Sequence, residues 1–223
     1  MNPLILAIDT TRESGSLALL RGQELVEETL LHSPGGFAHV IYGHLAQLLD
    51  RHGVTPAMVD CFAAASGPGS FTGVRVGLAC VKGLAEALGK PAVAVSNLEA
   101  LATFGSAPLR AVVLDARRGE IYGAVYDAAG RLAAPEVVTK FPAWLAKLPE
   151  GYVEFVSTDF TPFRAALAGT RFEHAPIATA PPALAAAVAC IALARFRGGE
   201  ASDPAALDAN YVRRPDAELF WRE

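Results

Sequence analysis

The chain has 223 residues, of which 52% are hydrophobic, and its formal net charge at pH 7 is −4. This length and apolar content suffice for a buried core, while the acidic balance excludes a basic nucleic-acid footprint spread over the whole chain. The longest apolar run, residues 182–196, is shorter than the ~20 residues of a membrane span, and no signal peptide is visible, so we expect a cytoplasmic protein.

The first part of the chain predicts three strands followed by alternating helices and strands. Residues 4–9 form a continuous apolar run, and a turn at Arg21-Gly22 separates the next two apolar segments. Apolar residues recur at helical spacing from Phe37 to His52 and stop at Gly53, a suitable position for a left-handed cap. A strand, a helix, a strand and a short helix are expected next, at residues 61–66, 73–88, 92–96 and from Asn97.

The second part of the chain repeats this order in a weaker form. Residues 111–138 predict three strands, of which the first ends in Asp115. Such a repeat predicts an α/β protein of two related halves, each with a mixed sheet covered by helices, and we expect the halves 1–107 and 108–223. The second half is reduced, and its later elements are a strand and two helices at residues 152–159, 161–169 and 182–196.

The segment SGPGSFTG, residues 66–73, is a glycine-bearing loop that leads into a helix. A Walker-type phosphate loop requires a lysine and a hydroxyl residue directly after its last glycine, whereas Val74 and Arg75 stand there. The alternative is a tight turn in which Ser70 or Thr72 caps the helix. The missing lysine favours this capping interpretation.

The helix after this loop carries a strip of small residues, Gly73, Gly77 and Cys80. Glycine inside a helix costs about 1 kcal/mol relative to alanine, so two glycines on one face need a compensating reason. The close approach of another backbone supplies one. That backbone belongs either to a partner or to the protein's own sheet, and the sequence leaves both interpretations open.

Three segments together resemble the TsaB (YeaZ) family: LAIDTTRESGSLALL (6–20), SGPGSFTGVRVG (66–77) and LDARRGEIY (114–122). The segment LDANYVRR (207–214) is similar to the family's closing signature, with Ala209 and Val212 in place of the usual proline and leucine. The resemblance implies a duplicated actin/sugar-kinase-like (ASKHA) fold. Members of this family are non-catalytic relatives of the TsaD/Kae1 proteins in tRNA threonylcarbamoyladenosine synthesis.

The same resemblance allows a test for catalysis at two positions. The catalytic relatives carry a His-x-x-x-His pair, which binds a metal from one face of a helix. These positions fall on Asn97 and Leu101, and leucine cannot coordinate a cation. The resemblance therefore implies no catalytic residue, metal or cofactor in the isolated chain, with ATP and the metal on a partner.

The implied function is a scaffold that dimerises with a TsaD-like catalytic subunit and activates it. The other implied partners are a TsaE-like ATPase and, through the complex, tRNA; a homodimer is the alternative assembly. The expected partner interface comprises the helix 73–88 and the helix 37–52 beside it, through Gly73, Val74, Gly77, Cys80, Val81, Leu84, Ile41 and Leu45.

Two strand-end turns keep a second hypothesis open, that of an independent ATP-dependent transferase or hydrolase. In the ASKHA fold such turns face a nucleotide, so Asp9 would hold a hydrated magnesium ion and Thr10 and Thr11 would bind phosphate oxygens. The alternative is an Asx turn that ends a strand. Arg117 and Arg118, in the second turn, form either a solvated hairpin edge or a contact with a partner's carboxylates.

Overall fold

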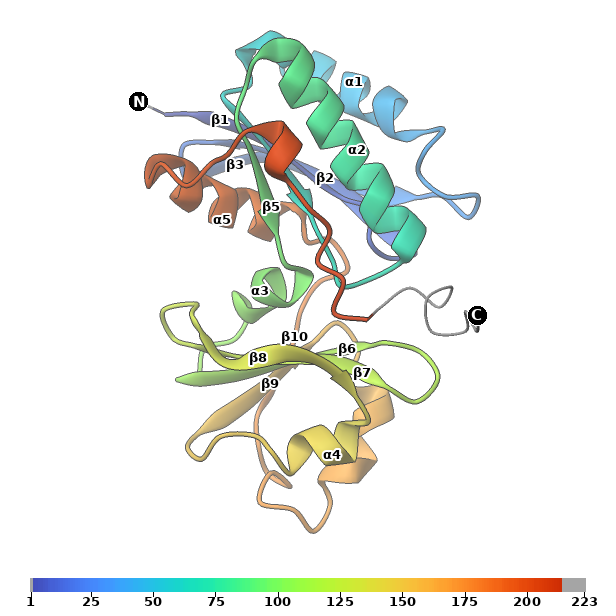
Figure 1. The fold of residues 1–223 in the computed structure, drawn as a ribbon, viewed down its shortest axis with the longest axis vertical. Coiled ribbons are helices and arrows are strands. Elements are labelled where there is room, and N and C mark those ends of the chain that lie inside the picture. The colour runs from blue at the N-terminus through green and yellow to red at the C-terminus, as the bar shows by residue number, and fades with distance from the viewer. Residues whose placement is uncertain (1, 214–223) are drawn as a thin grey trace, which may run out of the picture. The chain divides into compact units, whose positions relative to one another are not determined.

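The computed structural model describes residues 2–213, which divide into two compact units (Figure 1). The first unit contains the chain up to Asn97 and also Pro182–Asn210. The second unit contains Leu98–Pro181 and the described residues from Tyr211 onward. The chain therefore leaves the first unit, forms most of the second, and returns.

This division differs from the boundary expected between the halves 1–107 and 108–223. The reason is the last helix, α5 (Ala185–Arg197), which packs on strands of the first unit. Its apolar run shows that it is buried, but not which sheet it covers. That the first half binds a partner stays a prediction.

Five strands form the sheet of the first unit: β1 (Leu4–Asp9), β2 (Ser14–Arg21), β3 (Glu24–His32), β4 (Cys61–Ala65) and β5 (Ala92–Val95). Their order is β3-β2-β1-β4-β5, with β1, β2 and β3 antiparallel and β4 and β5 parallel to β1. Every residue of β1 is buried, which explains its continuous apolar run, because a strand covered on both faces shows no polar alternation.

Helices cover both faces of this sheet. Figure 1 shows α1 (Ile41–Arg51) and α2 (Phe71–Leu88) on one face and α5 on the other. Side chains of α1 and α2 share one core with β1 and β2, and α2 ends at Gly89 in the left-handed conformation. Two short 3₁₀ helices of this unit lie at Pro56–Met58 and Pro204–Ala206.

The second unit repeats the strand arrangement of the first. Its sheet has the order β10-β9-β6-β7-β8, with β6, β7 and β8 antiparallel and β9 and β10 parallel to β6. The predicted duplication is therefore confirmed. The strands are β6 (Leu109–Asp115), β7 (Ile121–Asp127), β8 (Leu132–Thr139), β9 (Val153–Ser157) and β10 (Ile177–Thr179).

The helical elements between residues 97 and 181 are short. They are α3 (Asn97–Ala102), α4 (Phe141–Leu145) and a 3₁₀ helix at Thr161–Leu167. An α-helix was expected at 161–169, and the tighter 3₁₀ form occurs instead. Clustered aromatic rings build the core here, with Phe141 contacting Trp144, Phe155, Phe160 and Phe163.

Candidate functional site

The turn that follows β1 is folded onto itself. The Oδ1 atom of Asp9 accepts hydrogen bonds from the backbone N–H of Thr11 at 2.9 Å and from its hydroxyl at 2.6 Å. Asp9, Thr10 and Thr11 are at most 1% exposed. These bonds confirm the Asx-turn interpretation of the strand end.

Helix α2 lies directly on this turn. The hydroxyl of Thr10 donates to the carbonyl oxygen of Gly73 at 2.7 Å. A Cβ atom on Gly73 would overlap the Thr10 carbonyl oxygen, and one on Gly77 would lie 2.7 Å from the Thr10 hydroxyl. The glycine strip therefore receives the protein's own backbone. This corrects the expectation that Gly73 and Gly77 admit a partner helix.

The loop 66–70 joins the turn to the start of α2. The N–H of Ser70 donates to the carbonyl oxygen of Thr11 at 2.6 Å, and the Ser70 hydroxyl accepts the N–H of Gly73 at 3.3 Å. Ser70 is thus the N-cap of α2, which confirms the capping interpretation and selects Ser70 over Thr72. Gly67 has φ = 104°, a conformation that favours glycine.

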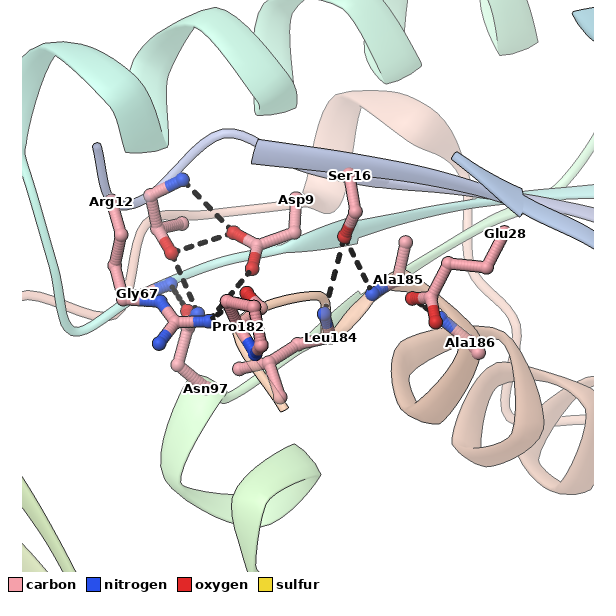
Figure 2. A network of polar contacts seen from close by, with 11 residues as sticks. Asp9, Arg12, Ser16, Glu28, Gly67, Asn97, Pro182, Leu184, Ala185 and Ala186 are labelled. Carbon is pink, nitrogen blue, oxygen red and sulfur yellow. Dashed lines mark hydrogen bonds and ion pairs between the residues drawn. The ribbon is translucent and has the colours of Figure 1, made fainter. Parts of the chain in front are cut away.

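Asn97 contacts both of these segments (Figure 2). Its Nδ2 atom donates to the Thr11 hydroxyl at 2.6 Å, and its Oδ1 atom accepts the N–H of Gly67 at 2.9 Å. The side chain is fully buried. The sequence singled out Asn97 only as a lost metal ligand, and an amide directly after a buried strand was the available sign of this structural role.

The turn does not fit a phosphate group in this arrangement. The hydroxyls of Thr10 and Thr11 donate within the protein, and Asp9 is fully buried. The second carboxylate oxygen of Asp9, Oδ2, has no hydrogen-bond partner and lies 3.9 Å from Nη2 of Arg12. Within residues 2–213, no three His, Cys, Asp or Glu side chains gather in a way that suits a metal ion.

The second strand-end turn, in the other unit, has the same local design. The N–H of Arg117 donates to Oδ1 of Asp115 at 2.8 Å, and Arg117 and Arg118 both have left-handed φ angles, 65° and 56°. Arg213 holds this hairpin by donating to the Ala116 carbonyl oxygen at 2.9 Å and by an ion pair with Glu120. Unlike the first turn, this one is open, because Asp115 is exposed.

Arg213 belongs to the closing segment 207–214, so this segment has a structural role in both units. Leu207 packs in the core of the first unit, and the N–H of Asn210 donates to the Ser66 carbonyl oxygen at 2.8 Å. The last position of the segment, 214, lies outside the described residues.

Comparison with known proteins identifies the family. A model of the family TsaD, tRNA N6-adenosine threonylcarbamoyltransferase, matches residues 36–190. The Bacillus subtilis (strain 168) protein named tRNA threonylcarbamoyladenosine biosynthesis protein TsaB is 31% identical over 237 residues, covering 98% of both chains. The chain belongs to the TsaB (YeaZ) family.

Solved structures agree with this assignment. YeaZ from Pseudomonas aeruginosa superposes with a TM-score of 0.77 at 29% identity, covering 94% of this chain and 99% of that one. Component A of the (R)-2-hydroxyglutaryl-CoA dehydratase of Acidaminococcus fermentans gives a TM-score of 0.55 at 11% identity, covering 87% of this chain and 99% of that one. The likeness shows the fold, which is of the actin/sugar-kinase type.

Most of the side chains expected at a partner interface of this TsaB-family chain are instead in its core. Only Leu84 is partly exposed, and the buried ones are Gly73, Val74, Gly77, Cys80, Val81, Ile41 and Leu45. They pack beneath α1 and α2, because the apolar stripe of each helix faces the sheet. The interface assignment is corrected for these side chains, but not for the two helices.

The solvent side of the two helices is a different set of residues, which we call the α1–α2 outer face. It comprises Tyr42, Gly43 and Ala46 on α1 and Arg75, Ala79 and Gly83 on α2, all exposed. Tyr42 of α1 lies close enough to the Cys80 thiol of α2 for this thiol to raise the pKa of the Tyr42 hydroxyl. Open space lies above Gly43 and Gly83, where an added Cβ meets nothing within 4 Å.

Helix α5 receives its N-terminal cap from the sheet of this TsaB-family chain, as Figure 2 shows. The Ser16 hydroxyl accepts the N–H groups of Leu184 at 3.1 Å and Ala185 at 3.0 Å, and Glu28 accepts the N–H of Ala186 at 2.8 Å. Burial raises the pKa of Glu28, and the negative charge of Asp9 raises it further. Two strands thereby fix the start of the returning helix.

Replacing Ser16 by alanine is expected to lower the free energy of unfolding by about 1–2 kcal/mol, because two N–H groups lose their acceptor. Chemical unfolding in urea measures this change. Ser14→Ala, on the same strand but at a partly exposed position, is the control and should unfold close to the wild type. Equal unfolding midpoints for the two variants would contradict the capping role of Ser16.

Among residues 2–213, no helix combines the length and the apolar character that crossing a membrane requires.

Proposed function

We propose that this chain is the scaffold subunit of a complex that synthesises N6-threonylcarbamoyladenosine at position 37 of tRNA. In this role it binds a TsaD-like threonylcarbamoyltransferase and activates it, without catalysing a step itself. The observation that carries the proposal is the full-length similarity to a protein named for this biosynthesis, in a chain whose β1 turn is closed. A role on tRNA implies a cytoplasmic location.

The closed turn supports the non-catalytic part of the proposal. A nucleotide-binding turn must offer donors to phosphate oxygens, whereas the Thr10 and Thr11 hydroxyls are bonded within the protein and buried. The alternative, an independent ATP-dependent transferase or hydrolase, would use the Asp9 turn, where the Oδ2 atom of Asp9 has no hydrogen-bond partner. That atom lies 3.9 Å from the Arg12 guanidinium in a fully buried position, which favours an ion pair within the protein over a hydrated magnesium ion.

The α1–α2 outer face is the surface proposed to meet the TsaD-like subunit. At Gly43, Ala46, Ala79 and Gly83 this face carries at most a methyl group, so a helix of the partner is able to approach closely. Tyr42, 56% exposed, offers an aromatic ring of the kind enriched at interfaces. A homodimer through the same face is the competing assembly, and a TsaE-like ATPase joins through the complex.

The net charge of −4 supports a scaffold that reaches tRNA only through its partners. Because phosphate contacts dominate nucleic-acid affinity, an acidic chain alone should bind tRNA weakly. We therefore expect the other subunits to supply the basic surface that binds tRNA. The ATP site and the catalytic metal belong to those subunits in this proposal as well.

Cells depleted of this protein are expected to lose threonylcarbamoyladenosine from the tRNAs that read codons beginning with adenosine. Nucleoside mass spectrometry of total tRNA measures the loss, and a plasmid-borne wild-type copy should restore the nucleoside. A second copy with Asp9→Asn tests the alternative function. Restoration by this variant supports a scaffold, whereas normal nucleoside levels after depletion would reject the assignment to this pathway.

A further inference from the structure

Three chain segments meet at one edge of the first sheet, where the parallel strands β1, β4 and β5 end. They are the turn 9–11, which begins at the last residue of β1, the loop 66–70, which directly follows β4, and Asn97, two residues after the end of β5. The backbone N–H of Asn97 donates to the Gly67 carbonyl oxygen at 2.8 Å. Together with the two side-chain bonds of Asn97, this contact ties the three segments to one another.

The amide of Asn97 fits this position because it offers a donor and an acceptor at the same time. The N–H of Gly67 can only donate, so it requires the amide oxygen. The Thr11 hydroxyl gives its hydrogen to Oδ1 of Asp9 and must accept from the amide nitrogen. A relay of hydrogen bonds therefore runs in one direction, from Asn97 through Thr11 to the Asp9 carboxylate. A carboxylate at position 97 would put a second acceptor where the Thr11 hydroxyl needs a donor.

The segments held by Asn97 lead directly into α2. Ser70, at the end of the held loop, donates its N–H to the Thr11 carbonyl oxygen and caps the first turn of α2 through Gly73. The neighbouring Thr10 hydroxyl bonds the Gly73 carbonyl oxygen. The start of α2 is thus connected to the turn 9–11 twice, through the N–H of its N-cap residue Ser70 and through the C=O of Gly73 in its first turn.

We propose that Asn97 is a positioning residue, which locks the loop 66–70 onto the turn 9–11 and so fixes the orientation in which α2 presents the α1–α2 outer face. This inference rests on the proposed function for the identity of the partner, a TsaD-like subunit. In this view, the buried polar groups at the end of β1 serve to align the helix that docks on the partner. The position that matches a metal ligand in the catalytic relatives thereby has a mechanical role here.

Two substitutions break the relay at different atoms. Asn97→Asp replaces the donating amide nitrogen by an oxygen that carries negative charge close to Asp9. Thr11→Val removes the bridging hydroxyl and keeps the side-chain shape. Thr11→Ser retains the hydroxyl and serves as the conservative rescue, and Asn2→Asp adds one negative charge at an exposed position as the charge control.

Two measurements on the full chain separate positioning from general stability. Amide hydrogen exchange at Gly73 and Val74 reports the first turn of α2, with amides of β2 as the internal reference. Isothermal titration with the purified TsaD-like subunit reports docking. Loss of one buried hydrogen bond corresponds to about a tenfold change in an equilibrium constant. We therefore expect Asn97→Asp and Thr11→Val each to lower the protection of Gly73 and Val74 about tenfold and to weaken the affinity by a similar factor.

The controls and the relative sizes of these effects decide the outcome. Thr11→Ser and Asn2→Asp are expected to retain wild-type protection and affinity. Unchanged affinity in both relay variants would overturn the inference, and so would an equal loss of protection in β2 and α2. If Asn97→Asp does not fold, Thr11→Val gives the same test. If the wild-type chain itself does not bind the subunit, the proposed function fails. The positioning role of Asn97 is then tested by the amide exchange at Gly73 and Val74 alone.

Discussion

Replacing Gly73 by alanine is expected to lower the free energy of unfolding by about 3 kcal/mol, the upper part of the range for overpacked cores. The added Cβ atom would overlap the carbonyl oxygen of Thr10, a backbone atom in a turn that three segments hold in place. Because a backbone atom cannot rotate away, relief requires α2 to move off the turn. The Thr10–Gly73 hydrogen bond is then lost as well.

Gly83→Ala is the matched control on the same helix. An added Cβ atom at Gly83 meets nothing within 4 Å, so the substitution only removes the cost of a glycine inside a helix. It should raise the free energy of unfolding by about 0.5–1 kcal/mol. Urea unfolding of the two variants is expected to give shifts of opposite sign. A wild-type midpoint for Gly73→Ala would show that the contact with Thr10 does not hold α2.

The elements of the first unit could be predicted from the sequence, because each signal there was local. The apolar run of β1 ends at Asp9, where the strand ends, and Ser70 caps α2 as its loop motif indicates. The repeated order of strand, strand, strand and helix predicted that the second sheet resembles the first, and the two sheets have corresponding strand orders. The strand end and the helix cap depend on hydrogen bonds and burial within a few residues of one another, and the repeat is visible in the order of the elements along the chain.

The direction in which the glycine strip faces could not be predicted, because it depends on contacts between residues far apart in the chain. Gly73 meets Thr10 across 63 positions, and both a partner helix and the protein's own turn satisfy the same spacing. For the same reason the role of Asn97 was missed, since its partner Thr11 is 86 positions away. Helix α5 returns to the first sheet through a cap at Ser16, 169 positions from Ala185.

These long-range contacts also change the reading of the interface. The residues with the strongest helical pattern, such as Val74 and Val81, face the sheet, because an apolar stripe marks the side of a helix that the protein buries itself. A docking surface on the opposite side carries small and polar residues, and periodicity gives it no signal. Burial in the folded chain is what distinguishes Ala79 and Gly83 from Gly73 and Gly77.

Replacing Ala79 by glutamate is expected to weaken binding of the TsaD-like subunit about hundredfold. Ala79 is exposed on the α1–α2 outer face, between Arg75 and Gly83 along α2. Docking would bury the new carboxylate without a partner, at a cost of about 2–3 kcal/mol, and each 1.4 kcal/mol is a factor of ten in affinity. The melting temperature of the isolated chain should stay close to that of the wild type, because the side chain points into solvent.

Ala194→Glu, at an exposed position of α5, is the control for added charge on a helix and should bind the subunit normally. Titration calorimetry and thermal unfolding on the same preparations give both quantities, and nucleoside mass spectrometry of complemented cells gives the consequence for tRNA. Sedimentation of the isolated Ala79→Glu chain tests whether a homodimer uses the same face, since that dimer would dissociate too. Normal affinity together with normal tRNA modification would place the partner surface elsewhere, because no partner helix can pass over this face without burying residue 79.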